Sequence, residues 1–138
     1  MSHTPLLNEH REQKIILVVE DSPTQAIQLK TALDHEGLAV FCAVNGRMGI
    51  RMAQELHPDV VVLDVQMPEV DGYEVARALK SISDTANIPI IMFTRQDTPE
   101  AVQLGIDVGV MDYIPKDAFA YAVLTETLRQ MGILGSDT

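Results

Sequence analysis

Several features common in other protein classes are scarce in this sequence of 138 residues. Trp is absent, and the one cysteine, Cys42, cannot form an internal disulfide, so we expect a reducing compartment, the cytoplasm. Basic residues are few, because 10 Lys and Arg stand against 20 Asp and Glu, which leaves a formal net charge of −10. Such a chain lacks the positive charge that binds nucleic acid or anionic membranes. We therefore expect no direct partner of either kind.

Long apolar runs are missing as well. The longest apolar stretches are a handful of residues, far below the ~20 that a membrane helix needs. The N-terminal segment has no apolar core typical of a secretory signal, and residues 1–13 are predicted to form a flexible tail. The remainder has the composition of one globular domain, with 46% hydrophobic and 22% charged residues. We place this domain at 14–132, followed by a short tail over 133–138.

Strand-like and helix-like patterns alternate along the domain. Short apolar runs of strand length are predicted as five strands over 14–19, 38–44, 59–63, 88–93 and 110–114. Apolar residues at helical spacing predict five helices over 22–37, 45–56, 71–82, 98–109 and 117–131. The expected N-caps of the first four helices are Ser22, Asn45, Asp71 and Thr98.

This alternation predicts an α/β domain. The first, third and fourth strands are almost wholly apolar, which fits a parallel sheet covered by helices on both faces. Since crossovers between parallel strands are right-handed, the doubly wound arrangement is favoured. Helical spacing also directs Leu104 toward the core, and Met111 is expected to fill the core beside the fifth strand.

Polar side chains follow four of the predicted strands. Glu20 and Asp21 come after the first strand, Asp64 after the third, Thr94 after the fourth and Lys116 after the fifth. The working site of a doubly wound sheet lies beyond the carboxyl ends of its strands. If the first and third strands are neighbours, three carboxylates converge there, and they cannot all stay ionised without a compensating charge.

A hard divalent cation such as Mg²⁺ is the natural compensation, because it prefers oxygen ligands. Lys116 and Thr94 add an ammonium group and a hydroxyl that can hold an incoming anion. Metal, ammonium and hydroxyl together suit a phosphoryl group. A carboxylate without another role would then be the nucleophile.

These residues carry a family resemblance. The matching motifs are Glu20-Asp21, the segment DVQMPEVDG at 64–72, Thr94, and YIPK at 113–116. In this order, over roughly 14–131, the chain resembles a CheY-like receiver domain of the response regulators of two-component signalling. The resemblance implies a five-stranded sheet of order 2-1-3-4-5.

The resemblance also implies roles for residues of the site. Asp64 would accept a phosphoryl group from a histidine kinase or a phosphotransfer protein. Asp21 and Asp64 would bind Mg²⁺ directly, the backbone carbonyl of Gln66 would be the third protein ligand, and Glu20 would act through a water. The chain would catalyse only its own phosphorylation and dephosphorylation, so no other enzyme activity is expected.

A switch is implied at the other side of the site. Thr94 and Lys116 would hold the phosphoryl oxygens, and Tyr113 would swing inward when Thr94 moves. This movement would alter the face formed by segments 98–109, 110–114 and 117–131 for a downstream protein. A monomer or a weak dimer is expected. No attached output domain is expected either, because only seven residues follow the last predicted helix.

Arg95, Gln66 and Gln96 are predicted to modulate how fast the phosphoryl group is gained or lost. The chain also departs from the family pattern at two positions. Arg95 stands where the family has a small residue, and Lys116 is followed by Asp117 instead of proline. Arg95 would restrict or hold a phosphodonor. Gln66 and Gln96 each lie two residues after a site residue and flank the expected route of a hydrolytic water.

Other functions are weighed against this one. Arg95 and the missing proline motivate an interaction module that works without phosphorylation. A Mg²⁺-dependent phosphatase is disfavoured, because Gln66 stands where a second acid would be needed. A nucleotide or flavin binder is disfavoured too, since no Gly-rich loop follows the first strand.

Overall fold

A computed structural model describes residues 13–135. Its strands are β1 (Ile15–Val19), β2 (Ala39–Ala43), β3 (Val60–Leu63), β4 (Ile90–Thr94) and β5 (Asp112–Pro115). Its helices are α2 (Pro23–Asp34), α3 (Gly46–Leu56), α4 (Gly72–Ser81), α5 (Pro99–Val108) and α6 (Ala120–Gln130). Every predicted strand and helix is therefore present. No helix within the described residues is long and apolar enough to cross a membrane.

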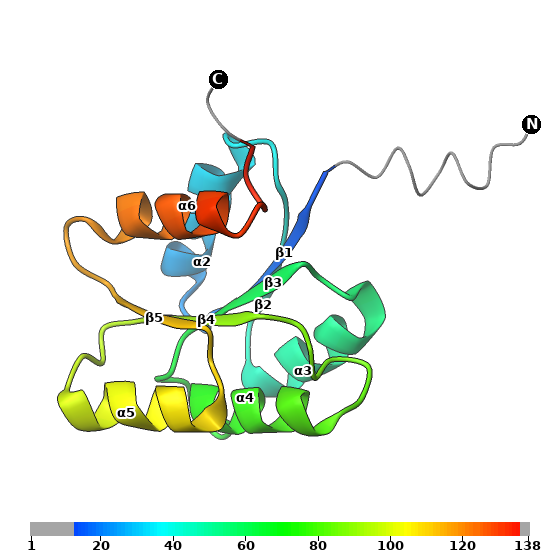
Figure 1. The fold of residues 1–138 in the computed structure, drawn as a ribbon, viewed down its shortest axis with the longest axis vertical. Helices are drawn as coiled ribbons and strands as arrows, with labels where there is room; N and C mark the ends of the chain where they lie inside the picture. Colours follow the sequence, from blue (N-terminus) through cyan, green and yellow to red (C-terminus); the bar gives the residue numbers. More distant parts are fainter. Residues whose placement is uncertain (1–12, 136–138) are drawn as a thin grey trace, which may run out of the picture.

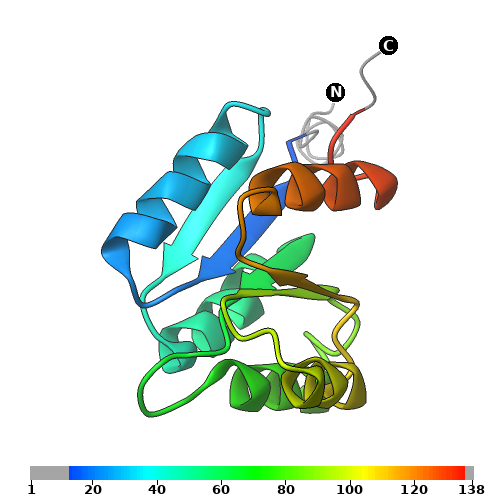
Figure 2. The same ribbon diagram turned by 90° about the vertical axis from the view of Figure 1, so that its left-hand side faces the viewer.

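The strands form one parallel sheet in the order β2-β1-β3-β4-β5, which confirms the predicted doubly wound topology. Figure 1 shows α2 and α6 on one face of the sheet and α3, α4 and α5 on the other. Figure 2 shows the same two layers of helices after a quarter turn. The parallel pairing brings the carboxyl ends of β1, β3 and β4 to one edge of the sheet.

The core has two parts because successive strand residues point to opposite faces of the sheet. In β1, Ile16 and Val18 contribute to the cluster under α2 and α6, whereas Leu17 and Val19 contribute to the cluster under α3 and α4. All four side chains are fully buried. This two-sided burial explains why the central strands are apolar runs without alternation.

The predicted N-caps are confirmed. The side chains of Ser22, Asn45, Asp71 and Thr98 each accept the amide N–H three residues later. Asp71 and Glu74 form a reciprocal capping box at the start of α4. At the other end of α5, Gly109 adopts a left-handed conformation with φ of 94°, as its predicted role in ending the helix requires.

Two predictions about the core were wrong. Leu104 is 36% exposed and Met111 is 49% exposed. The inner face of α5 is formed by small residues instead, because Gly105 lies against the ring of Tyr113 and leaves no room for a side chain. Helix α6 also starts later than expected, at Ala120, after a turn in which Asp117 accepts the N–H of Phe119.

The C-terminal boundary differs from the expected one. Ile133 and Leu134 are buried in the cluster under α2 and α6, although the sequence predicts a tail over 133–138. Their apolar side chains continue the core beyond the end of α6. The predicted N-terminal tail lies outside the described residues, except for residue 13.

Candidate functional site

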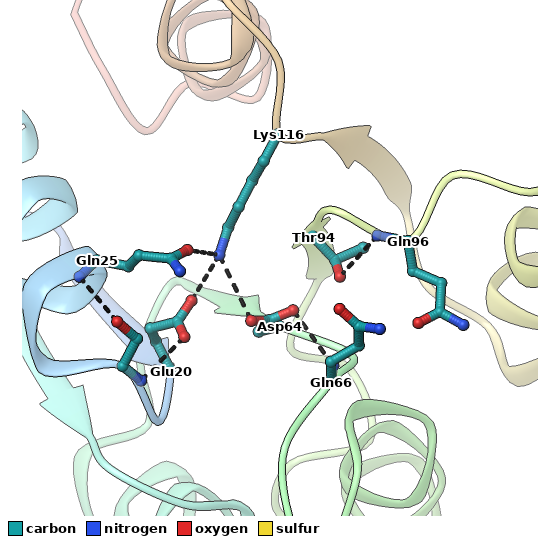
Figure 3. A network of polar contacts seen from close by, with 8 residues as sticks. Glu20, Gln25, Asp64, Gln66, Thr94, Gln96 and Lys116 are labelled. Atoms are coloured by element: carbon teal, nitrogen blue, oxygen red, sulfur yellow. Dashed lines mark hydrogen bonds and ion pairs between the residues drawn. The ribbon is translucent and has the colours of Figure 1, made fainter.

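The structure brings together the residues predicted from the strand ends. Glu20 and Asp64 directly follow β1 and β3, Thr94 is the last residue of β4, and Lys116 directly follows β5. Figure 3 shows their side chains converging from four elements into one volume. Glu20 and Asp64 are 5% and 8% exposed, and Thr94 is fully buried. The sheet topology therefore collects polar groups in a place where burial is costly unless they are paired.

Three carboxylates form a cluster at this edge. One oxygen each of Glu20, Asp21 and Asp64 lies within 4.8 Å of the other two. Asp21 is exposed, so the cluster opens to solvent on one side. A set of close, partly buried carboxylate oxygens fits a hard divalent cation. The backbone carbonyl of Gln66 stays the predicted third protein ligand, with Glu20 acting through a water.

Lys116 compensates part of this negative charge. Its Nζ lies 2.6 Å from Oε1 of Glu20 and 3.4 Å from Oδ2 of Asp64. It also donates a hydrogen bond to Oε1 of Gln25 and lies 5.7 Å from the centre of the Phe93 ring. The ammonium group is thus held beside the phosphoacceptor candidate by several partners at once.

Gln25 is a site residue that the sequence interpretation missed. It lies in the first turn of α2, and its N–H donates to the Ser22 cap. A helix that starts directly after β1 must begin at the carboxyl edge of the sheet, so its first turn faces the site. The predicted cap was therefore a signal that could have identified Gln25.

Burial is the main cause of an altered titration at Glu20. It raises the pKa of this carboxyl above its ordinary value of 4.5, and the nearby charge of Asp64 raises the pKa further. The hydrogen bonds from Lys116 and from the Ser22 backbone lower the pKa and offset part of the effect. The burial cost thus outweighs the stabilisation that Lys116 supplies.

Asp64 and Thr94 have matching local surroundings. The amide N–H of Gln66 donates to Oδ1 of Asp64 at 3.3 Å, and the amide N–H of Gln96 donates to Oγ1 of Thr94 at 3.3 Å. Each polar side chain at a strand end is thus oriented by the amide two residues later. The Gln66 side chain is exposed and that of Gln96 is half-buried.

Tyr113 lies beside the loop that follows β4. Its hydroxyl donates to the carbonyl oxygen of Gln96 at 2.8 Å. Burial raises the pKa of Tyr113 above its ordinary value, and the neighbouring Tyr73 adds to this shift. Tyr113 is therefore a neutral hydrogen-bond donor that ties β5 to the residue two positions after Thr94.

The two residues that depart from the family pattern, Arg95 and Asp117, line the same pocket as Lys116. Arg95 is exposed and lines a pocket of about 300 Å³ together with Glu20, Lys116 and Tyr121. All peptide bonds within residues 13–135 are trans, including the bond between Lys116 and Asp117.

Known proteins are similar to this chain in sequence. The family model of the response regulator receiver domain matches residues 16–129. The response regulator MprA of Mycolicibacterium vanbaalenii is 38% identical over 116 residues, which are 84% of this chain and 49% of that protein. This chain thus spans about half the length of the MprA regulators that it matches.

Solved structures are similar as well. The chemotaxis protein CheY4 of Vibrio cholerae matches with a TM-score of 0.79 at 31% identity, over 86% of this chain and 98% of that chain. The receiver domain of the sensor histidine kinase PA1611 from Pseudomonas aeruginosa matches with a TM-score of 0.78 at 26% identity, over 86% and 96% of the two chains. The PA1611 structure has a magnesium ion coordinated in its active-site cleft.

Proposed function

The chain belongs to the response regulator receiver domain family, and we propose that it is a switch controlled by phosphorylation of Asp64. One observation carries this proposal: Asp64 is buried beside an ammonium group and two further carboxylates, at the carboxyl edge of a parallel sheet. Structural ion pairs alone do not need a third carboxylate in the same volume. A metal and a phosphoryl group account for all of these groups together.

Mg²⁺ is the proposed cofactor. Its ligands would be Asp21, Asp64 and the backbone carbonyl of Gln66, with Glu20 bound through a water. The close carboxylate oxygens support this assignment, as does the ion in the PA1611 receiver domain. When bound, Mg²⁺ supplies positive charge that neutralises the phosphoryl oxygens during transfer.

Asp64 is the proposed nucleophile. One carboxylate oxygen forms a bond to phosphorus while the phosphorus–nitrogen bond of a phosphohistidine donor breaks, and the imidazole nitrogen leaves with the electron pair. Lys116 already lies 3.4 Å from Oδ2 of Asp64, so its charge is in place to hold an oxygen of the transferred group. The Thr94 hydroxyl would donate to a second phosphoryl oxygen.

The output is proposed to travel through Thr94 and Tyr113. Movement of Thr94 toward a phosphoryl group pulls on Gln96, whose N–H is bonded to the Thr94 hydroxyl. The carbonyl of the same Gln96 accepts the Tyr113 hydroxyl. This shared residue supports a change of the α5–β5–α6 face, which a downstream protein would recognise.

The partners are proposals of the same kind. A histidine kinase or phosphotransfer protein would supply the phosphoryl group in the cytoplasm, and the chain would catalyse only its own phosphorylation and dephosphorylation. Arg95, Gln66 and Gln96 would set the rates of these two reactions. Oligomeric state is proposed as monomer or weak dimer.

The test is phosphorylation in vitro. We expect incubation with phosphoramidate and Mg²⁺ to add the mass of one phosphoryl group to the intact protein. The isosteric variant Asp64→Asn should gain none, whereas the control Asp84→Asn, which changes an exposed carboxylate, should behave as the parent protein. If the parent protein gains no mass, or if Asp64→Asn gains as much, the phosphorylation-independent interaction module takes the place of this proposal.

A further inference from the structure

Tyr73 makes a contact that the proposed switch does not use. This tyrosine is the second residue of α4 and is 7% exposed. Its hydroxyl donates to the carbonyl oxygen of Ala101, in the first turn of α5, at 2.9 Å. A buried hydroxyl that reaches a backbone carbonyl of another helix fixes the spacing between the two helices at that point.

The start of α4 is also fastened to the phosphoacceptor. The N–H of Gly72 donates to the carbonyl of Val65 at 2.9 Å. A side chain at position 72 would overlap the backbone carbonyl of Asp64, so the two backbones are in direct contact. Tyr73 is the next residue along the chain. It therefore extends from a backbone that cannot shift without disturbing Asp64.

The far end of the contact lies close to Tyr113. In an α-helix the carbonyl of Ala101 also accepts the N–H of residue 105, and that residue is the glycine against which the Tyr113 ring lies. A Cβ at position 105 would be 2.8 Å from Cδ2 of this ring. Tyr73 is also a neighbour of Tyr113, because it contributes to the raised pKa of that side chain.

We propose that Tyr73 is a positioning residue of the switch, which fastens α5 to α4 and so opposes displacement of α5 when Asp64 takes up a phosphoryl group. This inference rests on the proposed function. Its path runs from Asp64 through Gly72 and Tyr73 to Ala101, and it does not pass through Thr94.

The inner face of α5 explains why one hydroxyl has this effect. Ala101 and Gly105, the buried residues of α5, are small. Small side chains bury little apolar surface, and the larger Val108 packs against the core only partly buried, so dispersion contacts hold the helix less firmly. The Tyr73 hydroxyl adds a directional contact to this smooth face. Removing it should make α5 easier to move without opening a cavity, because phenylalanine keeps the ring.

The experiment compares the parent protein with Tyr73→Phe by NMR of backbone amides, since the chain has no Trp to report by fluorescence. Amide hydrogen exchange is measured first without ligand. Beryllofluoride with Mg²⁺, a phosphoryl analogue, is then titrated while the amides of α5 are followed. The control is Ser81→Ala, which removes an exposed hydroxyl of α4 whose hydrogen bond to the carbonyl oxygen of Ala78 stays within the helix.

We expect Tyr73→Phe to speed exchange of the Gly105 amide by roughly threefold to tenfold, the range that corresponds to loss of one hydrogen bond. Half-saturation with beryllofluoride should need about threefold less analogue, because displacing α5 then costs less free energy. Ser81→Ala should change neither quantity.

The outcomes separate the two proposals. If exchange is faster but half-saturation is unchanged, the contact is structural and the inference is wrong. If neither quantity changes, Tyr73 does not hold α5 and the inference is wrong as well. If the parent protein responds to neither beryllofluoride nor phosphoramidate, the proposed function is wrong. This inference is then wrong too, because it rests on that function, whatever the exchange data show.

Discussion

The loops after β3 and β4 begin alike and are held in different ways. Each begins at a buried polar side chain, Asp64 in one and Thr94 in the other, that accepts the amide N–H two residues later. Beyond that point the resemblance ends. The comparison shows how neighbouring strands with the same local geometry can carry loops that are held by different kinds of contact.

The loop between β3 and α4 supports itself. Val65 and Met67 are buried in the core, and two backbone hydrogen bonds close the loop, from Val70 to Pro68 and from Gly72 to Val65. A capping box then starts α4. Backbone bonds and apolar anchors of this kind leave Asp64 little freedom.

The loop between β4 and α5 depends on other elements. Arg95, Asp97 and Thr98 are exposed, and hydroxyl groups from α4 and β5 fasten the segment at Ala101 and Gln96. Side-chain hydrogen bonds contribute about 1 kcal/mol each. The proposed phosphoryl group at Asp64 would therefore have only small energies to overcome on this side of the site.

The largest expected effect comes from breaking the fixed loop. Gly72→Ala forces a Cβ into the backbone at Asp64 and into Val65, so we expect the free energy of unfolding to fall by about 3 kcal/mol. Urea denaturation followed by circular dichroism measures this. The control is Gly135→Ala, because no atom lies within 4 Å of the added Cβ there. Equal urea midpoints for the two variants would show that the β3–α4 loop accommodates a Cβ at position 72 with little loss of stability.

The second largest effect is expected from removing the positive charge of Lys116, which pairs with two buried carboxylates. Lys116→Met removes the ammonium group beside Glu20 and Asp64. Leaving buried carboxylates unpaired should lower the free energy of unfolding at neutral pH by about 2 kcal/mol, and added Mg²⁺ should restore part of the loss. The control is Lys30→Met, because the exposed pair with Asp34 contributes little. A similar small loss in both variants would contradict the role of Lys116.

How much of this arrangement could be predicted from the sequence depends on the range of the interaction. The apolar runs, the caps and the polar residues at strand ends depend on neighbours in sequence, and they placed the sheet and the positions of Asp64 and Lys116 correctly. The exposure of Leu104 depends on Gly105 meeting the Tyr113 ring, which is a tertiary contact. Periodicity treats every apolar residue of a helical face alike, so it cannot detect such a contact.

Contacts made by long side chains could not be predicted from the sequence either. Gln25 reaches Lys116 across 91 residues of sequence, and Tyr73 reaches Ala101 across 28. No pattern in the sequence marks which atom the end of a flexible side chain will meet. Both contacts fasten the site without forming its chemical centre, which is why motifs for the chemistry do not contain them.

The third effect tests the movable loop directly. Tyr113→Phe removes the hydroxyl that bonds the carbonyl of Gln96. We expect amide hydrogen exchange at Gln96 to rise roughly threefold, with a stability loss of at most about 1 kcal/mol. Exchange at Gln66, the matching position in the other loop, should not change. Equal changes at Gln66 and Gln96, or none at either, would remove the distinction between the two loops.

The smallest expected effect is a pH dependence of the free energy of unfolding that comes from Glu20. Because burial raises the pKa of Glu20 in the folded protein above 4.5, the folded state binds more protons than the unfolded state between that value and the raised pKa. The contribution of Glu20 to the free energy of unfolding is therefore greatest below pH 4.5 and falls as the pH rises through the raised pKa. Hydrogen bonding from Lys116 offsets part of the burial cost, so the effect should be modest.

Glu20→Gln removes this titration. The parent protein should lose stability relative to Glu20→Gln as the pH rises above 4.5, in urea denaturation with a chelator present, since bound metal would favour the ionised form. Glu126→Gln, which changes a largely exposed carboxyl of α6, should leave the pH dependence of the parent protein unchanged. A parent protein that gains stability relative to Glu20→Gln over the same range would show that Lys116 outweighs burial.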